Sequence, residues 1–211
     1  NLAGDVYADT LAGGNGNDAL NGWGGGDSLV GGEGNDVLNG GGGADTMLGG
    51  NGNDRYVVDN ALDVVTESGT GADTVSSSVS LTLAAGQQIE TLELTGGALV
   101  GRGNEVANTL LGNGNNNILF GNGGDDAIDG AGGKDWMAGG AGLDTLSGGA
   151  GMDTLRGDAG NDDLSGGADA DKMWGGAGSD TFRYAAVTDS DLAGADTVFD
   201  FTATQDKIDL S

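Results

Sequence analysis

Aspartate recurs every nine residues along most of the chain, each time after a glycine-rich turn and two places before a single apolar residue. Five units stand in register over residues 13–57: GGNGNDALN, GWGGGDSLV, GGEGNDVLN, GGGGADTML and GGNGNDRYV. Nine more, from GNEVANTLL to GGAGSDTFR, follow over residues 103–183. Carboxylates and main-chain carbonyls are the hard oxygen ligands that calcium prefers. The spacing therefore indicates a series of calcium sites.

The composition also points to a bound cation. The 211 residues include 47 glycines and 33 acidic against 7 basic side chains, a net charge of −26. With 36% hydrophobic residues the chain cannot build a thick core, and its glycines lose much backbone entropy on folding. Without a counter-charge, such a chain resembles a disordered one. Cysteine and histidine are absent, so the usual ligands of zinc, copper and iron–sulfur centres are missing.

The same composition argues against several functions. Without histidine there is neither an HExxH zinc site nor a serine triad, and carboxylates committed to calcium cannot serve as acid and base. We therefore expect no catalytic residues here, and any activity would belong to another part of a larger parent protein. A net charge of −26 repels nucleic acid phosphates. No apolar run is long enough to span a membrane, and no signal peptide is recognisable.

Each nine-residue unit predicts a tight turn over its first six positions and a short strand over its last three. Only the middle residue of that strand, position eight, points inward. Two consecutive units make an 18-residue coil that stacks on the next at about 4.8 Å. The predicted position-eight residues are Leu20, Leu29, Leu38, Met47, Tyr56, Leu110, Leu119, Ile128, Met137, Leu146, Leu155, Leu164, Met173 and Phe182.

Stacked coils place aspartates that are 18 residues apart above one another. Bare carboxylates about 5 Å apart repel by roughly 1 kcal/mol in water and about 3 kcal/mol at an effective dielectric of 20. A calcium ion between two of them turns this repulsion into attraction. The predicted rows are Asp18, Asp36 and Asp54; Asp27 and Asp45; Asp126, Asp144, Asp162 and Asp180; and Asp135, Asp153 and Asp171.

The units resemble the glycine- and aspartate-rich nonapeptide of RTX (repeats-in-toxin, haemolysin-type) calcium-binding proteins, a known calcium-binding repeat. The resemblance implies an all-β fold, a right-handed parallel β-roll that is disordered in the calcium-poor cytosol. It also implies export by a type I secretion system and folding on calcium outside a Gram-negative bacterium, as a secreted or cell-surface protein. The implied ligands are the aspartates of the four rows and the turn carbonyls of Gly13, Asn15, Gly22, Gly24, Gly31, Glu33, Gly121, Gly123, Gly130, Gly132, Gly139, Ala141, Gly148, Ala150, Gly157 and Ala159.

Departures from the pattern predict weaker sites. Asn108 and Asn117 replace the aspartate in two units and offer a carbonyl without a charge, so calcium there should be weak or absent. Substituted glycines make the turns of Asp9 and Asp171 less regular. The additional acids Asp125, Asp158 and Asp163 are interpreted as solvated surface charge.

The period divides the chain into four predicted segments. Residues 1–57 form a first roll and residues 103–183 a second. Residues 58–102 lack the period and show longer, alternating strands, which predicts a wider β connector. Residues 184–211 resemble the segment that closes the roll in serralysin-type proteases and alginate epimerase R-modules, and are interpreted as a cap. Because the first residues already lie in a degenerate unit, we expect the sequence to be part of a longer protein.

One predicted sheet face of the second roll differs from the acidic remainder. It carries Phe120, Trp136, Arg156, Lys172 and Trp174. Aromatic and cationic groups together suit an anionic, alginate-like polysaccharide or a neighbouring domain, unless residues 58–102 or the C-terminal segment cover them. Two functions therefore remain open: a module that folds on calcium and supports secretion, and an adhesive or polysaccharide-binding module with structural calcium.

Overall fold

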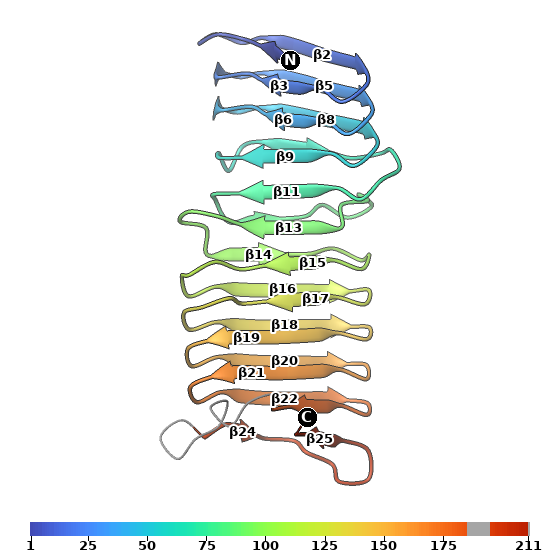
Figure 1. Ribbon diagram of the computed structural model, residues 1–211, viewed down its shortest axis with the longest axis vertical. Coiled ribbons are helices and arrows are strands. Elements are labelled where there is room, and N and C mark those ends of the chain that lie inside the picture. Colours follow the sequence, from blue (N-terminus) through green and yellow to red (C-terminus); the bar gives the residue numbers. More distant parts are fainter. Residues whose placement is uncertain (185–194, 211) are drawn as a thin grey trace. The chain divides into compact units, whose positions relative to one another are not determined.

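The computed structural model describes residues 1–184 and 195–210, and all of their assigned secondary structure is β-strand. It divides into two compact units, Asn1–Gly97 and Ala98–Ser211, and both are built of stacked strands (Figure 1). The strand pairs within each unit are parallel and join successive coils. Among the described residues, no helix is long and apolar enough to cross a membrane.

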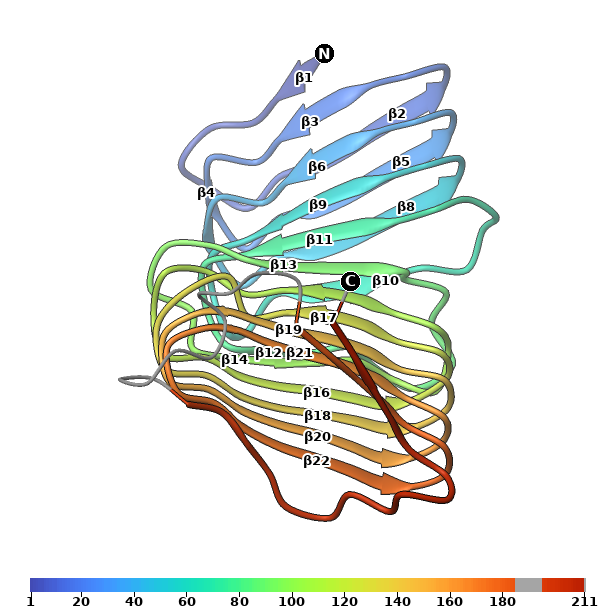
Figure 2. The same cartoon turned by 60° about the horizontal axis from the view of Figure 1, so that its bottom comes forward.

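The first unit stacks its coils into two main sheets. One sheet contains, in order, β1 (Leu2–Ala3), β3 (Ala19–Asn21), β6 (Val37–Asn39), β9 (Arg55–Val58), β11 (Thr74–Ser77) and β13 (Thr91–Leu94). The second contains β2 (Thr10–Asn15), β5 (Ser28–Glu33), β8 (Thr46–Asn51) and β10 (Val64–Thr66), and Figure 2 shows both from a second direction. A short pair, β4 (Gly24–Gly25) with β7 (Gly42–Gly43), lies in the turns, and β12 spans Leu81–Thr82.

The second unit repeats this design. One sheet contains β14 (Val100–Arg102), β16 (Ile118–Gly123), β18 (Trp136–Ala141), β20 (Thr154–Ala159), β22 (Lys172–Ala177) and β24 (Thr197–Val198). The other contains β15 (Thr109–Leu111), β17 (Ala127–Asp129), β19 (Thr145–Ala150), β21 (Asp163–Ala168), β23 (Thr181–Arg183) and β25 (Lys207–Asp209).

The pairing register confirms the 18-residue coil and the all-β, parallel β-roll. Leu20 pairs with Leu38 in the first unit, and Ile128 pairs with Leu146 in the second. Every predicted position-eight side chain is buried, with 0–2% of its surface exposed. One apolar residue per strand thus forms a thin, dry core between two sheets, as the sequence predicts.

Residues beyond the first repeat run continue the stack of the first unit. Val75 pairs with Tyr56 on one side and with Leu92 on the other, so successive coils here differ in length from the regular repeat. The compact-unit boundary falls between Gly97 and Ala98, and the four segment boundaries drawn from the sequence stay a prediction. Within the proposed C-terminal cap, β24 extends one sheet beside β22 and β25 extends the other beside β23. Residues 185–194 and 211 of that segment lie outside the described part.

The turns explain why the repeat favours glycine at positions two and four. Positions two and four adopt positive φ, for example Gly14 at 100° and Gly16 at 99°, a region that costs other residues about 1–2 kcal/mol. The same two positions hold all the non-glycine residues with positive φ in the described part of the chain. They are Trp23, Asn122, Ala131, Asp158 and Asp169.

Candidate metal centre

The repeat aspartates form hydrogen-bonded ladders along the turns. The N–H of Asp27 donates to Oδ1 of Asp45 at 2.7 Å, and that of Asp135 donates to Oδ1 of Asp153 at 2.7 Å. The bond recurs every 18 residues in the predicted rows, including Asp126 to Asp144 at 2.9 Å. One oxygen of each carboxylate is therefore fixed by the main chain of the preceding coil.

The second carboxylate oxygen, Oδ2, is buried without a hydrogen-bond partner at most of these aspartates. A buried, unpartnered carboxylate oxygen is costly, and a bound cation removes that cost. The unpartnered Oδ2 atoms belong to Asp27, Asp36, Asp45, Asp54, Asp126, Asp135, Asp144, Asp153, Asp162, Asp171 and Asp180, which are 1–2% exposed.

A main-chain carbonyl shares the space beside each Oδ2. A Cβ added to Gly13 would lie 2.8 Å from Oδ2 of Asp18 and 2.8 Å from the carbonyl oxygen of Gly31. The same convergence of a carboxylate and a position-one carbonyl recurs at other first glycines, including those of the second unit. Position one must be glycine because a methyl group would collide with both oxygens. An oxygen-lined site that lacks a positive partner fits calcium.

The predicted carbonyl ligands fall into two groups. Carbonyls of the first group lie beside a position-one glycine of the preceding coil, next to the aspartate or asparagine oxygen of that coil. They are the position-one carbonyls of Gly22, Gly31, Gly121, Gly130, Gly139 and Gly148. Those of Gly13 and Gly157 occupy the same repeat position. The position-three carbonyls of Glu33, Ala141, Ala150 and Ala159 instead accept an N–H from the neighbouring coil, at 2.6–3.0 Å. Asn15, Gly24, Gly123 and Gly132 are at this third position too. Their role as ligands stays a prediction.

Burial raises the pKa of several ladder carboxylates, most clearly in the second unit. It takes the pKa of Asp126 and Asp171 to about 7, with repulsion from Asp144 at the first and from Asp196 at the second adding to the effect. The pKa of Asp135, Asp153 and Asp162 rises to about 6, again chiefly through burial. The main-chain N–H bonds oppose these shifts. These five carboxylates therefore favour a proton or a cation beside them.

In three irregular units, a main-chain N–H of the same turn already binds the side-chain oxygen that corresponds to the unpartnered Oδ2 of the regular aspartates. The N–H of Asn104 donates to Oδ1 of Asn108 at 2.8 Å, and that of Asn113 donates to Oδ1 of Asn117 at 2.8 Å. Asp5 likewise donates its N–H to Oδ2 of Asp9 at 2.7 Å. These turns are capped from within, which supports the prediction that they are poor calcium sites.

Asp18 is the one predicted aspartate ligand outside this buried set. Its side chain is 19% exposed. Its N–H still donates to Oδ1 of Asp36 at 2.7 Å. Asp18 thus occupies the ladder position of its unit, with a more solvated side chain.

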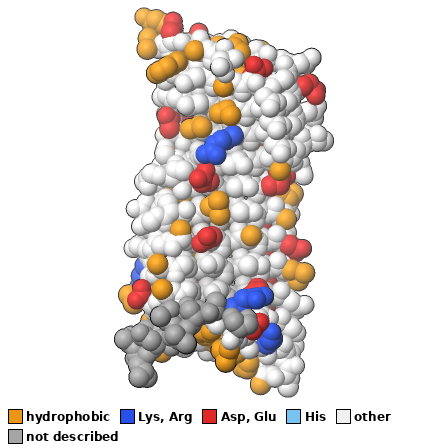
Figure 3. All heavy atoms as spheres, viewed as in Figure 1, with side chains coloured by type: hydrophobic (Ala, Val, Ile, Leu, Met, Phe, Trp, Pro, Cys, Tyr) orange, Lys and Arg blue, Asp and Glu red, His pale blue; other side chains and the backbone are white. Residues whose placement is uncertain are grey.

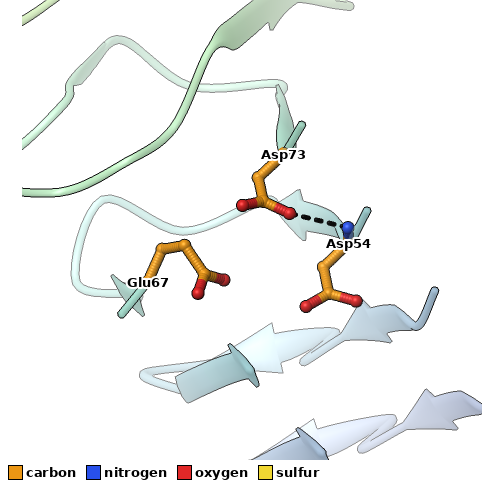
Figure 4. A group of neighbouring side chains, drawn as sticks. All are labelled: Asp54, Glu67 and Asp73. Carbon is orange, nitrogen blue, oxygen red and sulfur yellow. Dashed lines mark hydrogen bonds between the residues drawn. The ribbon is translucent and has the colours of Figure 1, made fainter. Parts of the chain in front are cut away.

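The structure adds acidic residues that the period did not reveal. Glu67 and Asp73 lie with Asp54 in a buried cluster whose ligand oxygens are all within 4.8 Å of one another (Figure 4). Asp73 sits in the sequence GTGADTV, which keeps the order glycine, glycine, aspartate and apolar residue. Asp73 follows Asp54 by 19 residues, so it falls outside the regular 18-residue spacing.

The predicted aromatic and basic face lies on the sheet of β16, β18, β20 and β22. Phe120 and Trp136 are 4.9 Å apart between ring centroids, and Trp174 stacks on Phe199 of the C-terminal segment at 4.2 Å. Arg156 pairs with Asp158 at 3.2 Å, while Lys172 is exposed. Part of this face is therefore covered by the chain itself. In the view of Figure 3 the acidic side chains are scattered singly.

Stacked turns of this kind on a parallel β-roll define an RTX-type calcium-binding repeat module. The chain belongs to the serralysin C-terminal family, because the family model described as "Peptidase M10 serralysin C terminal" matches residues 1–211. This region is the non-catalytic part of serralysin-like proteins, which are secreted. No curated protein gave a significant match to the chain.

Proposed function

We propose that this module folds when it meets calcium outside the cell, and that it thereby supports type I secretion and the stability of a larger exported protein. The observation that carries the proposal is the series of buried, unpartnered Oδ2 atoms. A fold that buries so many carboxylates is unstable until cations occupy its turns.

The calcium concentration differs between the inside and the outside of the cell, and this difference decides where the module folds. Extracellular calcium modules bind with dissociation constants of about 0.1–1 mM, far above the calcium concentration of the cytosol. When a site forms only on folding, the binding free energy becomes folding free energy. A chain with a net charge of −26 and no disulfide would therefore stay extended inside the cell and fold outside.

Secretion of the parent protein tests this proposal. Several ladder aspartates would be changed to asparagine together, for example Asp144, Asp153 and Asp162. We expect the variant to be synthesised in the same amount as the native protein. Less of it should be recovered in protease-resistant form from a medium with about 1 mM calcium. Equal resistance of the variant and the native protein would contradict the proposal.

A second candidate function is binding of an anionic polysaccharide through the aromatic and basic face. Arg102 supports it, since its guanidinium carbon lies 3.6 Å from the Phe120 ring centroid and adds a cation to the sheet that also carries Arg156 and Lys172. Trp136→Ala should then weaken binding to alginate, whereas Trp23→Ala, which removes an exposed tryptophan of the first unit, should not. Equal binding by both variants would remove this candidate.

A further inference from the structure

We propose that Asp54, the last aspartate of the first repeat run, forms a three-carboxylate calcium site with Glu67 and Asp73, two residues outside the nonapeptide pattern. The regular turns bring one carboxylate and a glycine carbonyl together, whereas this cluster brings together three carboxylates from three segments (Figure 4). The inference rests on the proposed function only in taking calcium as the ion.

The strand register explains how Glu67 reaches the site. Pairing of β10 with β8 sets Thr66 opposite Leu48, so that Glu67 falls at the level of Gly49. In the regular coils this level is occupied by another position-one glycine, whose carbonyl faces the aspartate of the preceding coil. Glu67 therefore supplies a charged ligand where the repeat supplies a neutral one.

Glu67 is held in place by its own turn and by a core residue. Oε1 accepts the N–H groups of Ser68 and Gly69, both at 2.6 Å, and Oε2 accepts a hydrogen bond from the Tyr56 hydroxyl. The Tyr56 oxygen in turn accepts the N–H of Gly49 at 2.8 Å. Tyr56 occupies position eight, where the other regular units carry Leu, Ile, Met or Phe. The Tyr56 hydroxyl thus connects the apolar core to the carboxylate of Glu67.

The two aspartates present oxygens that nothing else satisfies. Asp54 and Asp73 are 2% and 1% exposed, and Oδ2 of each has no hydrogen-bond partner. Their Oδ1 atoms are already bound, by the N–H of Asp36 at 2.8 Å and by that of Asp54 at 2.7 Å. Each of these two carboxylates is held in place and has a buried Oδ2 without a partner, so it is arranged to bind a ligand and not solvent.

The spacing and chemistry of the cluster favour calcium. Two oxygens bound to one calcium ion at about 2.4 Å lie at most about 4.8 Å apart, and the three carboxylates meet this limit. Zinc prefers nitrogen and sulfur ligands. Magnesium keeps several water molecules, which disfavours it at a site whose three residues are at most 3% exposed.

Calcium stoichiometry and affinity, measured by equilibrium dialysis on the full chain, test the inference. Glu67→Gln should bind one calcium ion fewer than the native chain while the sites at the other ladder aspartates remain filled. Glu105→Gln, which changes an exposed glutamate, is the matched control and should bind the native number. Circular dichroism in saturating calcium would verify that both variants fold.

Tyr56→Phe keeps all three carboxylates but removes the hydroxyl that binds Oε2 of Glu67. It should weaken the binding of one calcium ion by about tenfold or more, the scale of losses caused by removing groups that orient metal ligands. Native stoichiometry and affinity in Glu67→Gln would overturn this site alone. If Glu67→Gln fails to fold, the same result in Tyr56→Phe would overturn it. A native chain that binds no calcium would overturn both this inference and the proposed function.

Discussion

At the scale of single residues, each turn combines three requirements that only certain side chains meet. Position one must be glycine because two oxygens occupy the space of a Cβ, as at Gly13. Positions two and four need a residue that tolerates positive φ. Position six needs a carboxylate that accepts one main-chain N–H and directs its other oxygen at the neighbouring coil.

Ala131→Gly should stabilise the calcium-loaded protein. Ala131 has φ of 68° at position two, and relief of this strain, less the extra chain entropy of glycine, should give roughly 0.5–1 kcal/mol. Thermal unfolding in calcium measures the change. The control Ala127→Gly lies in strand β17 and should destabilise by about 0.5–1 kcal/mol. A lower melting temperature for Ala131→Gly would show that the turn is not strained there.

Asp153→Asn should weaken calcium binding, because it removes a charge whose Oδ2 is buried and unpartnered. Each tenfold loss of affinity lowers the calcium-dependent stability by about 1.4 kcal/mol at saturation. Calorimetric titration with calcium measures the affinity. The control is Asp125→Asn, which changes an exposed acid. The amide oxygen of the new side chain still accepts the Leu143 N–H that Oδ1 of Asp125 accepts in the native protein. Equal affinities in the two variants would exclude Asp153 as a ligand.

At the scale of elements, the 18-residue coil was predictable because its period links each strand to one inward residue. Leu20 and Leu146 illustrate this, since spacing alone placed them in the core. Glu67 and Asp73 were not predictable in this way. Their position depends on a coil of irregular length and on Tyr56, a residue that the sequence indicates only as apolar core. The covering of Trp174 by Phe199 also depends on a tertiary contact that no period encodes.

Asn117→Asp should create a further calcium site in the second unit. The amide of Asn117 now donates to the Ala98 carbonyl at 3.2 Å, and a carboxylate there would leave two oxygens facing each other. We expect one more bound ion and a larger loss of stability on calcium removal, both relative to the native chain. Metal analysis after dialysis counts the ions. An unchanged count would show that the neighbouring turn cannot complete a site.

At the scale of the whole molecule, protons should partly replace calcium. The folded-state pKa values of Asp126 and Asp171 rise to about 7, and those of Asp135 and Asp153 to about 6, whereas unfolded aspartates titrate near 3.9. The folded state therefore binds more protons between these values. The resulting stability is full below the unfolded pKa and is lost as the pH rises through the folded values.

The calcium-free chain should accordingly gain strand structure when the pH falls from about 7.5 to about 5. Circular dichroism in calcium-depleted buffer follows this gain. Calcium affinity should fall over the same range, because protons and calcium compete for the same oxygens. Loss of strand signal on acidification would contradict the assigned environment of these carboxylates.

The central claim is that calcium in the stacked turns holds this β-roll together. Circular dichroism of the calcium-depleted chain at about pH 7.5, followed through a calcium titration, tests it most directly. The account predicts a disordered spectrum at the start and a cooperative rise of β-strand signal with calcium, reversed by a chelator. A full β-strand spectrum in chelator, unchanged by calcium, would contradict it.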